Sequence, residues 1–360
     1  MNKKKGLLIC LILALGCGGI AWAQPRSDVF PPVTIDQPFV VNTFEASIRV
    51  VPVAIGLANP FDMAFRNNGD ILVTERFTGN LRVIRNGSLL EESIRGVPQV
   101  YSETWRQGLM AVELHPEDDR IVYMTYTKAI VADGEPEQTV ALIRARIVEN
   151  ELTQVEEIFQ AEGLDRGIAA SQLLFTPDNK LMMSIGGAYM YAGIGDYAQD
   201  PTIHYGKLLR LNDDGSVPSD NPFVSTGEYL PEVYSVGHRN QIGLAFHPTT
   251  DQLWATENGP QGGDEANIIQ PGLNYGWPIV SYSRQYSGDR GSLRPWGEEY
   301  EDPEVIWWPS IAPSGLAFYT GDKIPAWQGN MFVGSMMEGR IPGTGHLERC
   351  LLYTSPSPRD

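Results

Sequence analysis

The residues best suited to chemistry lie in one segment of the chain, Gly237 to Trp277. Near its start, Arg239 and Asn240 offer a planar cation beside an amide, a pair that suits an anionic planar ligand. In a generic loop, an arginine held in a structural ion pair is the alternative. The pair therefore indicates a binding site only if neighbouring residues supply further ligands.

A loop rich in glycine and proline follows, and it ends in two acids. Its residues include Asn258, Gly259, Pro260, Asp264 and Glu265. This composition predicts neither a strand nor a helix, so backbone carbonyls are freed from regular pairing. Carbonyl and carboxylate oxygens close together are the ligands that Ca²⁺ takes in flexible geometry. The loop is therefore a candidate cation site, and a glycine-rich turn with solvated acids is the alternative.

Two strand-like runs, Ile242 to Phe246 and Gln252 to Thr256, must position this segment. Their pattern of an alternating apolar run, a turn and a second alternating run occurs five times. The equivalent points in the five units are Phe65, Leu114, Phe175, Phe246 and Phe318. Such units predict antiparallel hairpins, and their repetition predicts an all-β propeller. His115 and His247 fall in the turns of these units and are interpreted as structural.

The first 23 residues have the features of a signal peptide. Three lysines precede an apolar stretch, Gly6 to Ile20, that is short for a membrane span, and Ala21 to Ala23 fits cleavage before Gln24. We expect export to the periplasm or beyond and no transmembrane span in the mature chain. A lipoprotein signal ending at Cys17 is the alternative, which Ala14 disfavours because that signal prefers a larger aliphatic residue there.

Charge and cysteine content narrow the class of protein. The net charge of -17 argues against nucleic acid and anionic membrane surfaces as partners. Outside the signal peptide, Cys350 is the one cysteine, so no disulfide framework is expected. The predicted domains are an N-terminal extension over 24–50, a propeller over 51–345 and an atypical tail over 346–360.

Five strings together resemble the soluble glucose/sorbosone dehydrogenase family. Three lie in the segment above: GHRN, ENGP followed by DE, and NYGWP. The others are HYGKLLRLNDDGSVPSDNP at His204 to Pro222 and WWPSIAPSGLAFYTGDKIPAWQGNMFVGS at Trp307 to Ser335. The resemblance implies a six-bladed β-propeller that uses pyrroloquinoline quinone (PQQ) and calcium to oxidise aldose sugars at the anomeric carbon. A soluble electron acceptor would then be the second substrate.

The same resemblance assigns roles to individual residues. It implies one calcium at the main-chain carbonyls of Gly259 and Pro260, and a second, structural calcium at Glu265 and Tyr275. The implied cofactor contacts are Arg239, Asn240, Asn258 and Asp264. Arg239 would also stabilise charge that develops on the reactive carbonyl, which makes it the implied catalytic residue.

Several positions depart from the family's pattern on the ligand-binding side. Ile168 stands where the family has its catalytic histidine, and isoleucine cannot accept a proton. The other departures are Gln172 for an arginine, Arg106 for a glutamine, Met337 or Glu338 for a lysine, and Gly186-Gly187 for a Gly-Asp pair. Asp165 is the best substitute base on the same loop, although a solvated loop acid is the simpler interpretation.

The C-terminal residues raise a further question. Residues His346 to Asp360 show no strand alternation, so the last blade is expected to be incomplete. A foreign or frame-shifted end and a disordered native tail are the two explanations.

Three functions remain open from the sequence. The first is PQQ-dependent aldose oxidation. The second is a catalytically silent, calcium-stabilised propeller that binds a sugar or a quinone. The third is a metal-dependent lactonase-like hydrolase, which would need several carboxylates converging on one metal. The identity of the sugar and the oligomeric state do not follow from the sequence.

Overall fold

The computed structural model describes residues 36–352 with the exception of 44, 103–106, 133, 166–168, 190–194, 291 and 293. In this part the chain is all-β apart from two short 3-10 helices, η2 (Gly195–Ala198) and η3 (Pro325–Trp327). No helix among these residues is long and apolar enough to cross a membrane. The predicted signal peptide, 1–23, lies outside the described residues, so export stays a prediction.

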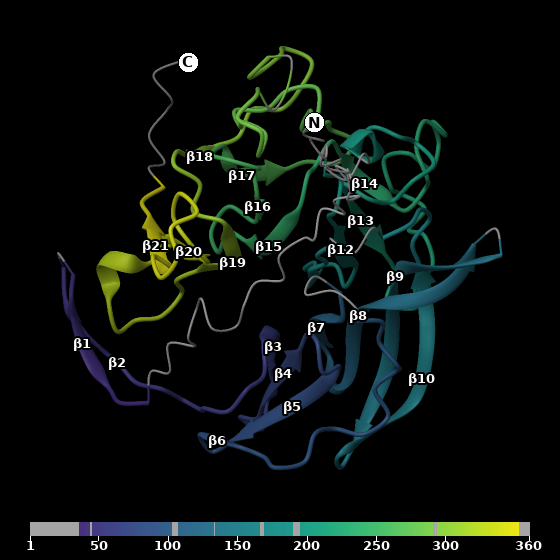
Figure 1. Ribbon diagram of the computed structural model, residues 1–360. Coiled ribbons are helices and arrows are strands. Elements are labelled where there is room, and N and C mark those ends of the chain that lie inside the picture. The colour runs from purple at the N-terminus through teal and green to yellow at the C-terminus, as the bar shows by residue number, and fades with distance from the viewer. Residues whose placement is uncertain are drawn as a thin grey trace, which may run out of the picture. The chain divides into compact units, whose positions relative to one another are not determined.

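Five antiparallel sheets follow one another along the described chain, and their strands pair in chain order (Figure 1). The first sheet contains β3 (Pro60–Phe65), β4 (Ile71–Glu75), β5 (Asn80–Arg85) and β6 (Ser88–Leu89). The second contains β7 (Leu109–His115), β8 (Asp118–Ala132), β9 (Glu135–Val148) and β10 (Glu151–Gln160). The third sheet contains β11 (Leu173–Phe175), β12 (Leu181–Ile185), β13 (Lys207–Leu211) and β14 (Val233–Val236). The fourth contains β15 (Gln241–Phe246), β16 (Leu253–Glu257), β17 (Asp264–Ile269) and β18 (Val305–Trp307). The fifth has three strands, β19 (Pro313–Phe318), β20 (Met331–Ser335) and β21 (His346–Cys350).

The first strand of each sheet lies against the first strand of the next. Strand β3 contacts β7, β7 contacts β11, β11 contacts β15, and β15 contacts β19. Successive sheets that meet through their first strands are typical of a β-propeller. The predicted all-β propeller is therefore confirmed. The predicted count of six blades is not, because the described residues hold five such sheets and one separate hairpin, β1 (Phe39–Asn42) with β2 (Ser47–Val50).

The five hairpin units predicted from the sequence form the first two strands of the five sheets. One boundary was wrong, because Asp264 and Glu265 open strand β17 and do not belong to the preceding loop. They pair with Trp307 and Ile306 of β18, which lie far along the chain and supply hydrogen-bond partners that local composition cannot reveal. The loop proper is therefore Asn258–Gly263.

The apolar core lies in layers between successive sheets. Strands β12 and β13 have every residue buried, because a sheet on each side covers both of their faces. This double burial explains LMMSI, which is a nearly continuous apolar run. In KLLRL the two buried cations are hydrogen-bonded, Lys207 to the carbonyl of Tyr197 and Arg210 to the carboxylate of Asp178. Rigid strands of this kind position the loops at the sheet ends, where the candidate site lies.

Strand β21 corrects a second expectation. The sequence after residue 346 shows no alternation and predicted no strand, but His346–Cys350 pairs antiparallel with β20 along its whole length. It is the outer strand of its sheet, and Leu347 is 67% exposed. Backbone pairing, rather than two buried faces, makes this a strand, so apolar alternation could not reveal it. The predicted tail boundary at 346 is otherwise untested.

Candidate active site and cation pocket

The segment GHRN begins where strand β14 ends, and its glycine allows a close approach. Gly237 adopts a φ of +79°, and a Cβ there would lie 2.1 Å from the side-chain oxygen of Asn274. Tyr275 donates its backbone N–H to Val236 (2.9 Å), and Trp277 donates to Gly237 (2.9 Å). The GHRN and NYGW segments therefore lie side by side, as a binding site built from both requires.

His238 is fully buried and holds an acid in place. Its ring stacks on Tyr275 with 4.6 Å between centroids. One ring nitrogen lies 2.8 Å from the hydroxyl of Ser235, and the other lies 3.2 Å from Oε1 of Glu257. A neutral imidazole satisfies both contacts by accepting from the serine and donating to the carboxylate. His238 thus orients Glu257, which is a structural role.

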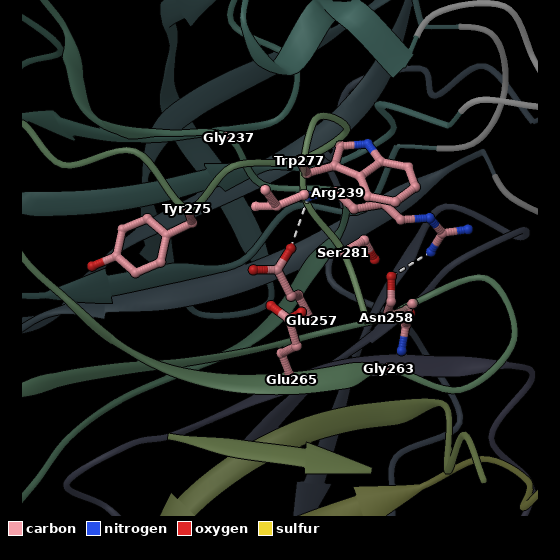
Figure 2. A pocket seen from close by; sticks show the side chains of 11 residues that line it. Gly237, Arg239, Glu257, Asn258, Gly263, Glu265, Tyr275, Trp277 and Ser281 are labelled. Atoms are coloured by element: carbon pink, nitrogen blue, oxygen red, sulfur yellow. Dashed lines mark hydrogen bonds between the residues drawn. The ribbon is translucent and has the colours of Figure 1, made fainter. Parts of the chain in front are cut away.

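Arg239 presents unpaired donors although it is only 3% exposed. Its guanidinium lies over Tyr189 (4.2 Å to the ring centroid) and near Trp277 (5.5 Å), and Nη1 donates to the Asn258 carbonyl (Figure 2). Its backbone N–H donates to Glu257 at 2.7 Å. Among the described residues, Nε and Nη2 have no hydrogen-bond partner. A buried cation with free donors is costly unless a ligand completes it, so Arg239 points to an electron-rich planar ligand.

Asn240 and Asn258 meet beside this arginine. Asn240 donates from Nδ2 to Oδ1 of Asn258 (3.2 Å), and Asn258 donates to the carbonyl of Pro313 (2.9 Å). In the described part of the chain, Oδ1 of Asn240 is buried without a partner. Gly186 makes room for it, because a Cβ at that position would lie 2.1 Å from this oxygen. Three of the four predicted cofactor residues are thus brought together.

The loop Asn258–Gly263 folds tightly on itself. Gly262 and Gly263 adopt positive φ angles of +69° and +64°. Their carbonyl oxygens would lie 2.5 and 2.4 Å from a Cβ on Gly259, so this position accepts only glycine. The fourth predicted cofactor residue, Asp264, is fully buried behind the loop, and its Oδ1 accepts the Gly259 N–H at 2.7 Å. Its predicted contact with the cofactor stays a prediction.

A buried acid and a partly buried acid face each other next to this loop. Glu257 on β16 pairs in register with Glu265 on β17, and both line a cavity of about 20 Å³ with Tyr275 (Figure 2). That volume holds one water molecule or ion. Burial, and secondarily the charge of Glu257, raises the pKa of Glu265 well above its usual range. A cation here would relieve this repulsion, so the carboxylate pair fits a metal.

Glu257 was missed by the sequence analysis, because its pairing with Glu265 depends on the register of β16 and β17. No group of three or more His, Cys, Asp and Glu side chains able to hold a metal occurs among the described residues. A cation at this cavity must therefore take main-chain oxygens as well. The hydroxyl of Tyr275 cannot serve, because it donates to Ile268 (2.6 Å) and accepts from Gln270 (2.9 Å); its backbone carbonyl remains.

The departures from the family's pattern are only partly visible. Ile168 and Arg106 lie outside the described residues. Asp165 is not a solvated loop acid as the simpler interpretation had it: it is fully buried, and Oδ1 accepts the N–H of Ala169 (3.2 Å). His204 is buried and accepts the N–H of Glu162 (2.8 Å), which gives it a packing role.

Comparison with known proteins identifies the family. The family model for Glucose / Sorbosone dehydrogenase matches residues 57–346. The chain belongs to the glucose/sorbosone dehydrogenase family. The aldose sugar dehydrogenase YliI of Escherichia coli is 33% identical over 308 residues, which cover 81% of this chain and 79% of the relative. The quinoprotein glucose dehydrogenase B of Acinetobacter calcoaceticus is 28% identical over 366 residues, covering 79% and 74%.

A solved structure extends the likeness to a cofactor-bound relative. The PQQ-bound aldose sugar dehydrogenase of Streptomyces coelicolor superposes with a TM-score of 0.62 at 26% identity, covering 87% of this chain and 85% of that one. The resemblance predicted from the sequence strings is therefore confirmed. The family consists of sugar dehydrogenases, which are oxidoreductases.

Proposed function

We propose that this protein oxidises aldose sugars at the anomeric carbon to lactones, with PQQ and Ca²⁺ as cofactors. One observation carries the proposal: the buried guanidinium of Arg239 has unpaired Nε and Nη2 donors and lies beside the glycine-rich loop. A planar, anionic quinone would satisfy those donors. The names of the relatives, which include a quinoprotein and a PQQ-bound enzyme, support the same cofactor.

The chain's own residues would hold the cofactors and tune their reactivity. When bound, the quinone accepts the hydride of the sugar, and calcium polarises its reactive carbonyl. Arg239 would donate hydrogen bonds to that carbonyl and stabilise the charge that develops there. Asn240 and Asn258 would fix the orientation of the ring system. The aromatic rings of Tyr189 and Trp277 hold the guanidinium, so the donors are preorganised.

Two cation positions are proposed. The first uses the carbonyls of Gly259 and Pro260, on the loop that contacts Arg239 through Asn258. The second, structural position uses Glu265 and the backbone carbonyl of Tyr275, and Glu257 is added here because it lines the same cavity. Oxygen ligands of this kind suit Ca²⁺.

The proton acceptor is the open part of the mechanism. The anomeric hydroxyl must lose a proton as the hydride leaves, and Ile168 at the family's histidine position cannot take it. A silent propeller that binds calcium and a sugar or a quinone is therefore the second candidate. A lactonase-like hydrolase is disfavoured, because no cluster of three metal-binding side chains occurs in the described ranges.

Location and architecture complete the proposal. The sequence of residues 1–23 supports export to the periplasm or beyond, where a soluble acceptor would collect the electrons. Six blades are proposed for the family fold.

Dye reduction tests the proposed activity. The mature chain is loaded with PQQ and Ca²⁺ and supplied with a panel of aldoses and an artificial acceptor, beside an Ile168→His variant. Dye reduction by the unmodified chain is the expected result and means that another group accepts the proton. If the cofactor binds and only the histidine variant turns over, the silent propeller is correct. Absence of cofactor binding to either protein would contradict the oxidation and the quinone-binding propeller, and would leave only a propeller that binds a sugar.

A further inference from the structure

Asp264 has a carboxylate that two separate backbone segments share. Its Oδ1 accepts the N–H of Gly259 at 2.7 Å. Its Oδ2 accepts the hydroxyl of Ser310 at 2.5 Å, the N–H of Ile311 at 2.8 Å and the N–H of Ala312 at 2.7 Å. One side chain thus connects the loop Asn258–Gly263 to a turn that lies more than forty residues further along the chain.

These contacts leave little capacity for a ligand. An ionised carboxylate has roughly four lone-pair sites, and four donors already point at this one. Asp264 is fully buried, and it does not line the cavity beside Arg239. Its chemistry is therefore that of an acceptor for backbone donors, which would otherwise be buried unpaired at a cost.

The turn on the other side of the carboxylate is itself constrained. Ala312 adopts a left-handed φ of +48°, which disfavours a residue with a Cβ, and its N–H is one of the donors to Asp264. The same turn accepts the side chain of Asn258 at the Pro313 carbonyl (2.9 Å) and the hydroxyl of Ser335 at the Ile311 carbonyl (2.8 Å). Ser335 ends β20, so the turn is also tied to the last described sheet.

We propose that Asp264 is a positioning residue that fixes the loop Asn258–Gly263 against the turn Ser310–Pro313. Because Asp264 accepts the backbone N–H of Gly259, it fixes the positions of the Gly259 and Pro260 carbonyls relative to Arg239. The loop and the turn are then joined through this carboxylate, so that loss of its hydrogen bonds moves the cation ligands. We call this link between the loop and the turn the Asp264 clamp. The effect of the clamp on the cation rests on the function proposed above, whereas the existence of the clamp does not.

Three variants separate a clamp from a ligand. Ser310→Ala removes one donor to Asp264 without touching the cation side of the loop. Asp264→Asn keeps the shape but replaces an acceptor with a donor that faces backbone N–H groups. Ser335→Ala is the matched control, because it removes a buried hydroxyl contact to the same turn that does not involve Asp264.

Two readouts are measured on the full mature chain. Amide hydrogen exchange over 258–263 is followed without cofactor, and PQQ binding is titrated calorimetrically at saturating Ca²⁺. We expect Ser310→Ala and Asp264→Asn to speed exchange over 258–263 and to weaken PQQ binding by about tenfold or more, with Ser335→Ala unchanged in both. If Asp264→Asn does not fold, Ser310→Ala carries the test.

Two other outcomes lead to different conclusions. Loss of binding in Asp264→Asn, with exchange over 258–263 and the Ser310→Ala variant both unaffected, overturns the clamp and makes Asp264 a direct ligand. No PQQ binding by the unmodified chain contradicts the proposed function alone, because the exchange measurement still decides whether the clamp exists.

Discussion

The proposed chemistry depends on the guanidinium group of Arg239. It is buried against two aromatic rings, Tyr189 and Trp277, and one of its nitrogens donates to the Asn258 carbonyl. A lysine would supply a point charge with neither the planar fork nor the stacking surface. The site therefore requires arginine itself, and another positively charged side chain would not replace it.

Substitution Arg239→Lys should weaken PQQ binding by roughly 10- to 100-fold, the range for hydrogen bonds to a charged group. Calorimetric titration in excess Ca²⁺ measures this. The matched control is Arg120→Lys, at an exposed guanidinium that pairs with Asp118, and binding should be unchanged there. Equal affinity of the Arg239 variant and the unmodified chain would remove Arg239 from the cofactor site.

Glu265→Gln should stabilise the calcium-free protein and reduce its response to calcium. The carboxylate lies close to Glu257 and has its pKa raised by burial, so replacing it with a neutral amide relieves a desolvation cost. We expect the unfolding temperature without calcium to rise by about 2–4 °C, with a smaller further rise on adding Ca²⁺ than in the unmodified chain. The exposed Glu304→Gln variant serves as control and should keep the full calcium response. A full response in Glu265→Gln would place the structural cation elsewhere.

At this scale the sequence located the site but not all of its contacts. Arg239, Asn240 and Asn258 were predicted together because local strings carry them, and the structure brings them within hydrogen-bond reach. Glu257 was missed because its role depends on cross-strand register. The partners of Asp264 at 310–312 could not be predicted, because they are backbone groups from a distant turn and have no side-chain signature.

The elements that position the site are the first strands of the sheets, and acids link these strands. Asp62 on β3 accepts the N–H of Val112 on β7 at 3.0 Å, and the carboxyl of Glu113 on β7 lies beside the backbone N–H of Phe175 on β11. Each contact joins one sheet to the next. Burial raises the pKa of Asp62 to about 6 and that of Glu113 to about 8, the latter helped by the charge of Asp62.

These pKa shifts predict that stability falls as the pH rises. Both acids hold protons more tightly when folded than when unfolded, so between about pH 4 and 8 the folded state binds more protons, and raising the pH disfavours it. Glu113→Gln should remove much of the decline above pH 6, a difference of about 1–3 kcal/mol at pH 8. Urea unfolding from pH 5 to 9 measures the slope, with the exposed Glu117→Gln as control. An unchanged slope in Glu113→Gln would show that this carboxyl titrates normally.

Hairpin existence was predictable at this scale, whereas strand length was not. Alternation in the five units correctly located the first two strands of each sheet, because turn residues bound the runs. Strands β8 and β9 extend to 15 and 14 residues, well beyond the alternating core of their unit. They pair with each other at twelve positions, from Ile121 with Arg146 to Ala132 with Glu135. The sequence of either strand alone does not predict this pairing, so the strand lengths could not be predicted.

At the scale of the whole molecule, the N-terminal hairpin is joined to the last described sheet. Arg349 on β21 donates to Glu45 at 2.6 Å and lies over Trp327, 5.6 Å from its ring centroid. The hairpin's own strand β1 is exposed along its length, including Phe39 and Val40. The contact between Arg349 and Glu45 thus links the two ends of the described chain.

Arg349→Ala should therefore loosen the hairpin without unfolding the propeller. We expect faster amide exchange over 39–50 and a change in unfolding temperature below about 2 °C, because an exposed ion pair contributes little to global stability. Arg49→Ala, at an exposed position of β2 itself, should leave exchange over β1 unchanged. Full protection of the hairpin in Arg349→Ala would mean that other contacts hold it.

Above all, this propeller is proposed to pass electrons from a sugar to a bound quinone. Single-turnover spectroscopy tests it most directly. The mature chain is loaded with PQQ and Ca²⁺, an aldose is added without any electron acceptor, and the absorbance of the cofactor is followed. We predict its conversion to the reduced form in one equivalent per chain. A bound cofactor that stays oxidised with every aldose tried would contradict the claim and leave a binding protein in its place.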